Sequence, residues 1–144
     1  MEEKTLKKLE FYTVLQNVAD FATSPSAKNL VLSLQPEGDF ALINQLLSET
    51  GEAFWLINQN VIPSFDFDDV TEALKKAKIH SSLTLRELLA VKRLLRTSRL
   101  CSSTLNEVEE SKITFLKIYA NGMYQNLPFE DQLDKCIINE DELA

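Results

Sequence analysis

Positive charge is concentrated in one short stretch of this sequence, KKAKIHSSLTLRELLAVKRLLRTSR at residues 75–99. The stretch holds eight basic residues and one acid, a net charge of +7 in a 144-residue chain whose total is −7. Such a cluster can contact phosphate groups or an acidic protein surface. The candidate nucleic-acid- or partner-binding residues are therefore Lys75, Lys76, Lys78, Arg86, Lys92, Arg93, Arg96 and Arg99.

The same basic residues could instead form a solvated or internally paired face, and we prefer this interpretation to ligand binding. Long basic side chains commonly cover apolar surface, face water or pair with acidic neighbours. The rest of the chain is strongly acidic and would repel a polyanion. A cationic face alone does not specify a ligand, so both interpretations stay open.

Few other residues could carry chemistry. Asp66, Asp68 and Asp69 could bind a hard cation, but no EF-hand spacing follows them. Capping of the helix that follows explains these aspartates better. His80 is the single histidine, and we expect it at the surface.

Motifs for cofactor or nucleophile chemistry are absent from the sequence. It contains neither a phosphate-binding loop nor a dinucleotide-binding glycine motif. Cys101 and Cys136 have no local histidine, and we predict two reduced thiols that act as small core residues. We therefore predict no catalytic residue, no cofactor site and no metal site in this chain.

The clearest helix start is the capping box at Thr84 and Glu87, and it predicts a helix over Leu85–Leu105. Apolar residues at helical spacing occupy one side of this helix, and the basic residues lie on the opposite arc. Ser24 and Asp39 are further predicted caps. The other predicted helices are Thr5–Ala22, Pro25–Leu34, Phe40–Gln59, Val70–Lys78, Ile113–Gln125 and Phe129–Ile138. In Phe40–Gln59 the predicted core residues are Ile43, Leu46, Leu47, Phe54 and Ile57, and Trp55 is predicted to be partly buried.

These elements predict an all-α protein of about six to seven helices with antiparallel helical hairpins, forming a single domain over residues 1–144. Only three glycines and four prolines are present, too few for a many-turned β protein. No apolar run approaches the roughly 18 residues that a membrane span requires. The first residues lack a secretory hydrophobic region, and we expect a cytoplasmic protein.

The order of short motifs along the chain resembles a known family. These motifs are Thr5-Leu6, Leu9-Glu10-Phe11, Val14-Leu15, Leu34-Gln35-Pro36, Glu49-Thr50-Gly51-Glu52-Ala53, Pro63, Asp69-Val70, Leu74, Lys76-Ala77, Leu83 and Glu87-Leu88-Leu89. In this order they are similar to the N-terminal core region of the Smr-bearing second branch of the MutS family. The connection Ile79–Ser82 departs from that pattern, because family members often have glycine there and this sequence has His80.

The resemblance implies an N-terminal fragment of a larger DNA mismatch-repair-like enzyme. Its parent would add the rest of the helical core and a clamp, a dimerising ATPase that uses ATP and Mg, and usually a C-terminal Smr endonuclease domain. The family is associated with DNA binding, suppression of recombination and, in some bacteria, rescue of collided ribosomes. The implied partners are therefore DNA or the ribosome, the remaining core domain and a second copy of the parent. No catalytic residue of the family carries over onto these 144 residues.

Three functional hypotheses follow. In the first, the chain is a non-catalytic core portion that relays nucleotide state between the ATPase and the nucleic-acid clamp. In the second, it is a stand-alone nucleic-acid-binding module that acts through residues 75–99. In the third, it is a helical protein-interaction module that docks the same basic face on an acidic partner.

Overall fold

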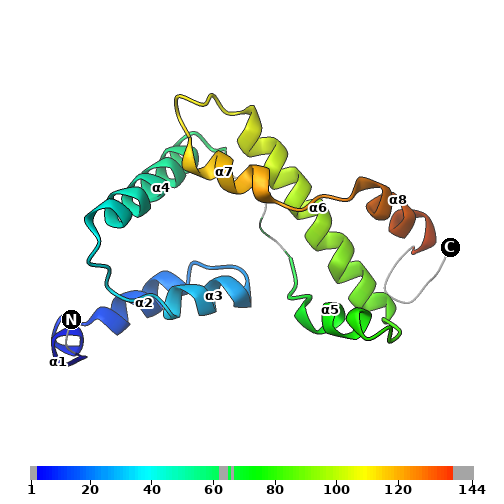
Figure 1. Cartoon of the computed structure of the whole chain (residues 1–144), viewed down its shortest axis with the longest axis horizontal. Helices are drawn as coiled ribbons and strands as arrows, with labels where there is room; N and C mark the ends of the chain where they lie inside the picture. Colours follow the sequence, from blue (N-terminus) through cyan, green and yellow to red (C-terminus); the bar gives the residue numbers. More distant parts are fainter. Residues whose placement is uncertain (1–2, 62–64, 66, 138–144) are drawn as a thin grey trace. The chain divides into compact units, whose positions relative to one another are not determined.

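The predicted all-α class is confirmed by a computed structural model, which describes residues 3–61, 65 and 67–137. Within these residues the chain forms eight α-helices and no strand (Figure 1). The helices belong to two compact units, Met1–Gln45 and Leu46–Ala144. The single-domain interpretation of residues 1–144 stays a prediction. No described helix combines the length and the apolar character needed to cross a membrane.

The first unit contains α1 (Glu3–Lys8), α2 (Phe11–Ala19), α3 (Pro25–Leu32) and the start of α4. Helices α2 and α3 pack against each other. The prediction of one helix over Thr5–Ala22 was wrong, because Glu10 adopts a left-handed conformation with φ of 54°. A left-handed residue interrupts the hydrogen-bond ladder of a right-handed helix. This break raises the helix count above the six to seven predicted.

Several helices begin at the side-chain N-caps that the sequence predicts. The Ser24 Oγ accepts from the Ala27 N–H at 3.2 Å, and the Asp39 Oδ1 accepts from the Ala41 N–H at 2.8 Å. The capping box of α6 is complete: the Glu87 N–H donates to the Thr84 Oγ1 at 3.2 Å, and the Thr84 N–H donates to the Glu87 carboxylate at 2.8 Å. All three predicted caps are confirmed.

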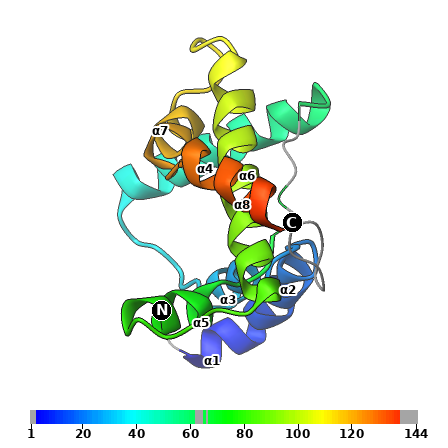
Figure 2. The same ribbon diagram turned by 90° about the vertical axis from the view of Figure 1, so that its right-hand side faces the viewer.

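The second unit is built around the longest helix, α6 (Leu85–Glu107). It contacts α5 (Thr71–Lys78), α7 (Phe115–Gly122) and α8 (Leu127–Cys136), as Figure 2 shows. Two hydrogen bonds set the direction of α7 along α6: the Ser98 Oγ donates to the Tyr124 carbonyl at 2.7 Å, and the Lys117 Nζ donates to the Asn106 carbonyl at 3.5 Å. Helices α6 and α7 therefore form an antiparallel hairpin.

The boundaries of the last two helices differ from the predictions. Helix α7 ends at Gly122 instead of Gln125. Helix α8 begins two residues early, because the Asn126 Oδ1 caps it by accepting from the Phe129 N–H at 3.2 Å. Pro128 therefore lies in the first turn of the helix, where its missing N–H costs no hydrogen bond. The stretch between the predicted helices Phe40–Gln59 and Val70–Lys78 lies partly outside the described residues.

The turn after α5 is the position at which the family resemblance leads us to expect glycine. His80 is exposed, as predicted, and adopts a left-handed φ of 56°. The Ser81 N–H donates to the Lys76 carbonyl at 2.9 Å, and the His80 N–H donates to the Ala77 carbonyl at 2.9 Å. This is the helix-ending geometry that glycine favours, and in this chain His80 adopts it.

The core of the second unit lies where α4, α6 and α7 meet, and several residues predicted to belong to it are exposed instead. Its buried members are Leu56, Cys101, Leu105, Ile113 and Ala120, and Trp55 packs against them partly buried, as predicted. Cys136 is exposed, so its assignment to the core was wrong. Four predicted core residues of α4 (Phe40–Asn58) are also exposed: Leu46, Leu47, Phe54 and Ile57.

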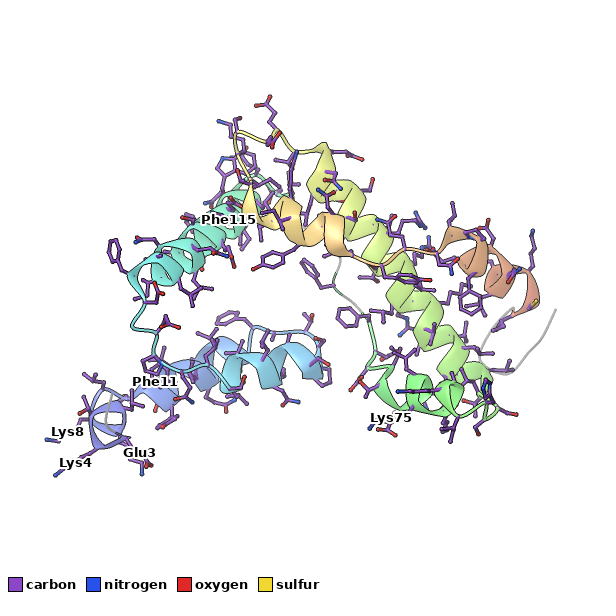
Figure 3. The ribbon with its side chains drawn as sticks, viewed as in Figure 1. Glu3, Lys4, Lys8, Phe11, Lys75 and Phe115 are labelled. Atoms are coloured by element: carbon purple, nitrogen blue, oxygen red, sulfur yellow. The ribbon has the colours of Figure 1, made fainter. Side chains whose placement is uncertain are left out.

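The orientation of α4 follows from two of its glutamates. The Glu52 carboxylate accepts from the backbone N–H groups of Thr114, Phe115 and Leu116 at 2.7, 3.1 and 2.9 Å. It thereby caps the N-terminus of α7, where an anion is favoured by unpaired N–H groups and the helix dipole (Phe115 is labelled in Figure 3).

Glu49 adds a second link on the same side of α4, because the Tyr119 hydroxyl donates to its Oε1 at 3.0 Å. This hydrogen bond raises the pKa of Tyr119. The polar side of α4 therefore faces α7, and much of its apolar side faces outward.

Gly51 lies within α4, and a Cβ built at this position would meet no described atom within 4 Å. We predict that Gly51→Ala raises the free energy of unfolding by about 0.5–1 kcal/mol, because alanine has the higher helix propensity and restricts the unfolded chain. Urea denaturation followed by circular dichroism measures the change. Gly38→Ala, outside any helix, is the matched control. A lower stability of Gly51→Ala would contradict the prediction.

Candidate functional site

The eight candidate basic residues lie on α5 and α6, and five of them form ion pairs with described acidic residues. Figure 3 shows these two helices with Lys75 labelled. Four of the five pairs join different elements, and only the pair Lys75–Glu72 lies within one helix. They are Lys75–Glu72, Lys76–Glu87, Lys92–Asp134, Arg93–Asp68 and Arg99–Glu130.

Two of these ion pairs attach α8 to α6. The Arg99 guanidinium donates to both oxygens of Glu130, with Nε–Oε1 at 3.2 Å and Nη2–Oε2 at 3.1 Å. Glu130 is buried, and its hydrogen bonds to Arg99 raise the arginine pKa. Lys92 pairs with Asp134 one turn farther along α8, and this contact lowers the aspartate pKa. Because Lys92 and Arg99 are seven residues apart, both pairs lie on one side of α6.

Two further pairs attach the region of α5 to the first half of α6. The Lys76 Nζ donates to the Glu87 Oε1 at 2.6 Å, while the other Glu87 oxygen serves the capping box. Together, the contacts with Lys76 and the Thr84 backbone lower the pKa of Glu87 to about 2. The Arg93 Nη1 donates to the Asp68 Oδ2 at 2.9 Å.

The N-cap residue of α5 is Val70, which has no side-chain cap, but one of the aspartates before it contacts the first residue of the helix. The Asp69 Oδ1 accepts from the N–H and the hydroxyl of Thr71 at 2.9 and 2.6 Å. These bonds lower the pKa of Asp69. Asp68 instead pairs with Arg93, and Asp66 lies outside the described residues. Among the described residues, no three His, Cys, Asp or Glu side chains converge as a metal ion would require.

Three candidate residues differ from the other five. Lys78, Arg86 and Arg96 are exposed and form no ion pair with an acidic residue of the described chain. Arg86 borders a polar hollow of about 450 Å³ that also contains Asp68, Asp69, Glu87 and Arg93. Both signs of charge line this hollow, so it does not form a uniformly cationic phosphate site.

A second hollow was not anticipated from the sequence. It measures about 260 Å³, is almost entirely apolar and lies between α4, α6 and α7. Cys101 is buried on its floor, and burial raises the pKa of that thiol, which makes a nucleophilic thiolate unfavourable. Its lining residues are Ala53, Leu56, Ile57, Val61, Phe65, Cys101, Leu105, Leu116, Tyr119 and Met123.

The two glutamates that orient α4 were also missed as functional positions. Both belong to the segment Glu49–Ala53, which carries part of the family resemblance. The available signal was this pair of acids, which are the only charged residues in the sequence of α4. Their partners lie more than sixty residues away along the chain, so no local pattern identifies them.

No family model matches the chain. Over its full length, however, the chain is similar to curated bacterial proteins. It is 30% identical over 146 residues to Endonuclease MutS2 of Ruminiclostridium cellulolyticum. It is 32% identical over 146 residues to Endonuclease MutS2 of Alkaliphilus metalliredigens and 31% identical over 149 residues to that of Lachnospira eligens. The chain spans only about 18% of the length of each of these relatives.

We predict that Arg99→Met lowers the free energy of unfolding by roughly 2–3 kcal/mol, because it leaves the buried Glu130 carboxylate without its cation. This value is below that for a fully buried pair, because the Arg99 side chain is 32% exposed. Urea denaturation measures the loss. The double variant Arg99→Met/Glu130→Leu should recover most of the stability, and Arg86→Met is the exposed control. Equal stability of Arg99→Met and the wild type would contradict the prediction.

A second prediction concerns pH and Glu87, whose pKa is lowered to about 2 by its contacts with Lys76 and Thr84. A lowered pKa contributes stability that is complete above the ordinary value near 4.5 and is lost as the pH falls toward 2. The melting temperatures of wild type and Glu87→Gln should therefore differ most above pH 5 and converge near pH 2. Thermal melts across this range provide the measurement, with Glu72→Gln as control. A constant difference would contradict it.

Proposed function

We propose that this chain is a non-catalytic helical core portion of a longer MutS-like DNA-binding ATPase and endonuclease, equivalent to its N-terminal region. The observation that carries the proposal is the match over the entire chain to proteins named Endonuclease MutS2, of which it spans about 18%. The ordered motifs quoted above support the N-terminal assignment. ATP and Mg would then bind elsewhere in the longer protein.

In this proposal the task of the chain is mechanical, namely to relay nucleotide state from the ATPase to a nucleic-acid clamp. The arrangement of the second unit supports such a role. Ion pairs join α6 to α8 and to the region of α5, and Glu52 joins α4 to α7. These side-chain links restrain the relative motion of the helices, so a displacement at one of them is passed to its neighbours.

The partners and location of the longer protein belong to the same proposal. DNA or the ribosome would bind through the assembled protein, in the cytoplasm and as a homodimer. The rest of the core domain would pack directly against this portion. The internal ion pairing of the basic residues fits this division of labour, because most of the local positive charge is already neutralised by acids of the same chain.

A second candidate function is a stand-alone module that binds nucleic acid or an acidic protein. It is favoured by the exposure of Lys78, Arg86 and Arg96, which form no ion pair with the described acidic residues. Phosphate contacts through these residues would give an affinity that falls steeply with salt concentration.

A prediction separates the two candidates. For a core portion, the purified chain should hydrolyse no ATP, and Arg86→Glu/Arg96→Glu should change its affinity for a duplex DNA by less than twofold. For a stand-alone module, the same double variant should weaken binding at least tenfold, because two phosphate contacts become repulsive. Phosphate release and fluorescence anisotropy at two salt concentrations are the measurements. Lys4→Glu/Lys28→Glu, with the same change of charge, is the control.

A further inference from the structure

An outward-facing arc of α4 within the second unit carries apolar residues where a solvated helix would carry polar ones. Successive residues of a helix turn by 100°, which places Leu47, Gly51 and Phe54 on the far side from Glu49, Glu52 and Leu56. Leu46 and Ile57 lie at the edge of the arc that is nearer to Glu49. Leu47 is 64% exposed, Phe54 is 66% exposed and Ile57 is 54% exposed. The arc consists of Leu46, Leu47, Thr50, Gly51, Phe54, Ile57 and Asn58. None of these residues is charged, and Thr50 and Asn58 are its polar members.

The spacing of this arc indicates the shape of what would cover it. Leu47, Thr50, Phe54 and Ile57 follow one another at intervals of three, four and three residues. This is the repeat with which one helix receives the side chains of another. Gly51 lies beside Leu47 and Phe54, and the space around its missing side chain is free of described atoms. A glycine here weakens α4 unless another backbone approaches closely.

The arc continues into the apolar hollow of the same unit. Ile57 belongs to both, and the hollow extends from it toward Tyr119 of α7 and Cys101 of α6. Exposed Phe54 and Leu47 lead away from Ile57 along α4. From Leu47 to Ile57 the arc runs for roughly 15 Å, or nearly three turns of helix. Its lack of charge favours a partner that is apolar along its contact stripe.

We infer that this arc is the docking surface for an amphipathic α-helix carried by the longer protein outside these 144 residues. The inference rests on the proposed function. The length of the relatives supports this occupant, because more than four fifths of each lies outside the matched portion. The docked helix crosses α4 near Gly51 and inserts apolar side chains between Leu47 and Phe54 and into the hollow beside Ile57.

The test compares the isolated chain with the longer protein expressed from the reading frame that contains it. Phe54→Cys is introduced into both, and alkylation by iodoacetamide is followed by peptide mass spectrometry, which separates this thiol from Cys101 and Cys136. The expected result is a rate at least tenfold slower in the longer protein. Glu72→Cys, at an exposed charged position of α5, is the control and should react at similar rates in both.

Three results would overturn the inference. Equal rates at Phe54→Cys in both proteins would show that the arc stays uncovered. Slow reaction in the isolated chain at every dilution would show that the chain covers its own arc. Slowing that grows with the concentration of the isolated chain would identify a second copy as the occupant.

A second variant tests the close approach at Gly51. Gly51→Leu should leave the melting temperature of the isolated chain unchanged or raised, and it should lower that of the longer protein by several degrees. An equal effect in both proteins would count against a crossing helix.

A stop codon directly after Ala144 would refute the proposed function itself. A longer protein that hydrolyses ATP but leaves Phe54→Cys unprotected would refute the docking surface alone.

Discussion

The ion pair between Arg99 and the buried Glu130 is the interaction on which the arrangement of α6 and α8 depends. Glu130 is only 3% exposed, and burying its carboxylate without a partner would cost much free energy. Arg99 supplies that partner with two N–H groups in a fixed fork. Lys92 repeats the contact one turn along α8, at the more exposed Asp134. The pairing is directional, because only one register of α8 brings both acids to both cations.

A charged side chain of one helix also stabilises another helix on the side of the second unit where α4 meets α7. The Glu52 carboxylate satisfies three backbone N–H groups at the start of α7, a task that a residue of α7 itself would normally perform. This contact directs one side of α4 toward α7 and thereby turns Leu47 and Phe54 outward. The exposed apolar arc is therefore a consequence of how α4 is held.

The charge distribution has a different meaning in the folded protein than in the linear sequence. A stretch with a net charge of +7 is a strong candidate for binding a polyanion. In the structure its cations reach acids that precede α5, open α6 or lie on α8, and positive charge without such a partner is reduced to a few exposed side chains. The charge thus serves mainly to join helices, which agrees with a portion that transmits movement within a larger protein.

The sequence by itself determined the helical class and most helix starts, because caps such as Ser24, Asp39 and the Thr84–Glu87 box act over three residues. It could not locate the break at Glu10, which no glycine or proline marks. It also misassigned the inward side of α4, since apolar spacing indicates that a side will be covered but not by what. Only the tertiary structure decided that Glu52 would cap the N-terminus of α7 and that Arg99 would meet Glu130. Those choices depend on residues that are distant along the chain and meet only when the helices pack.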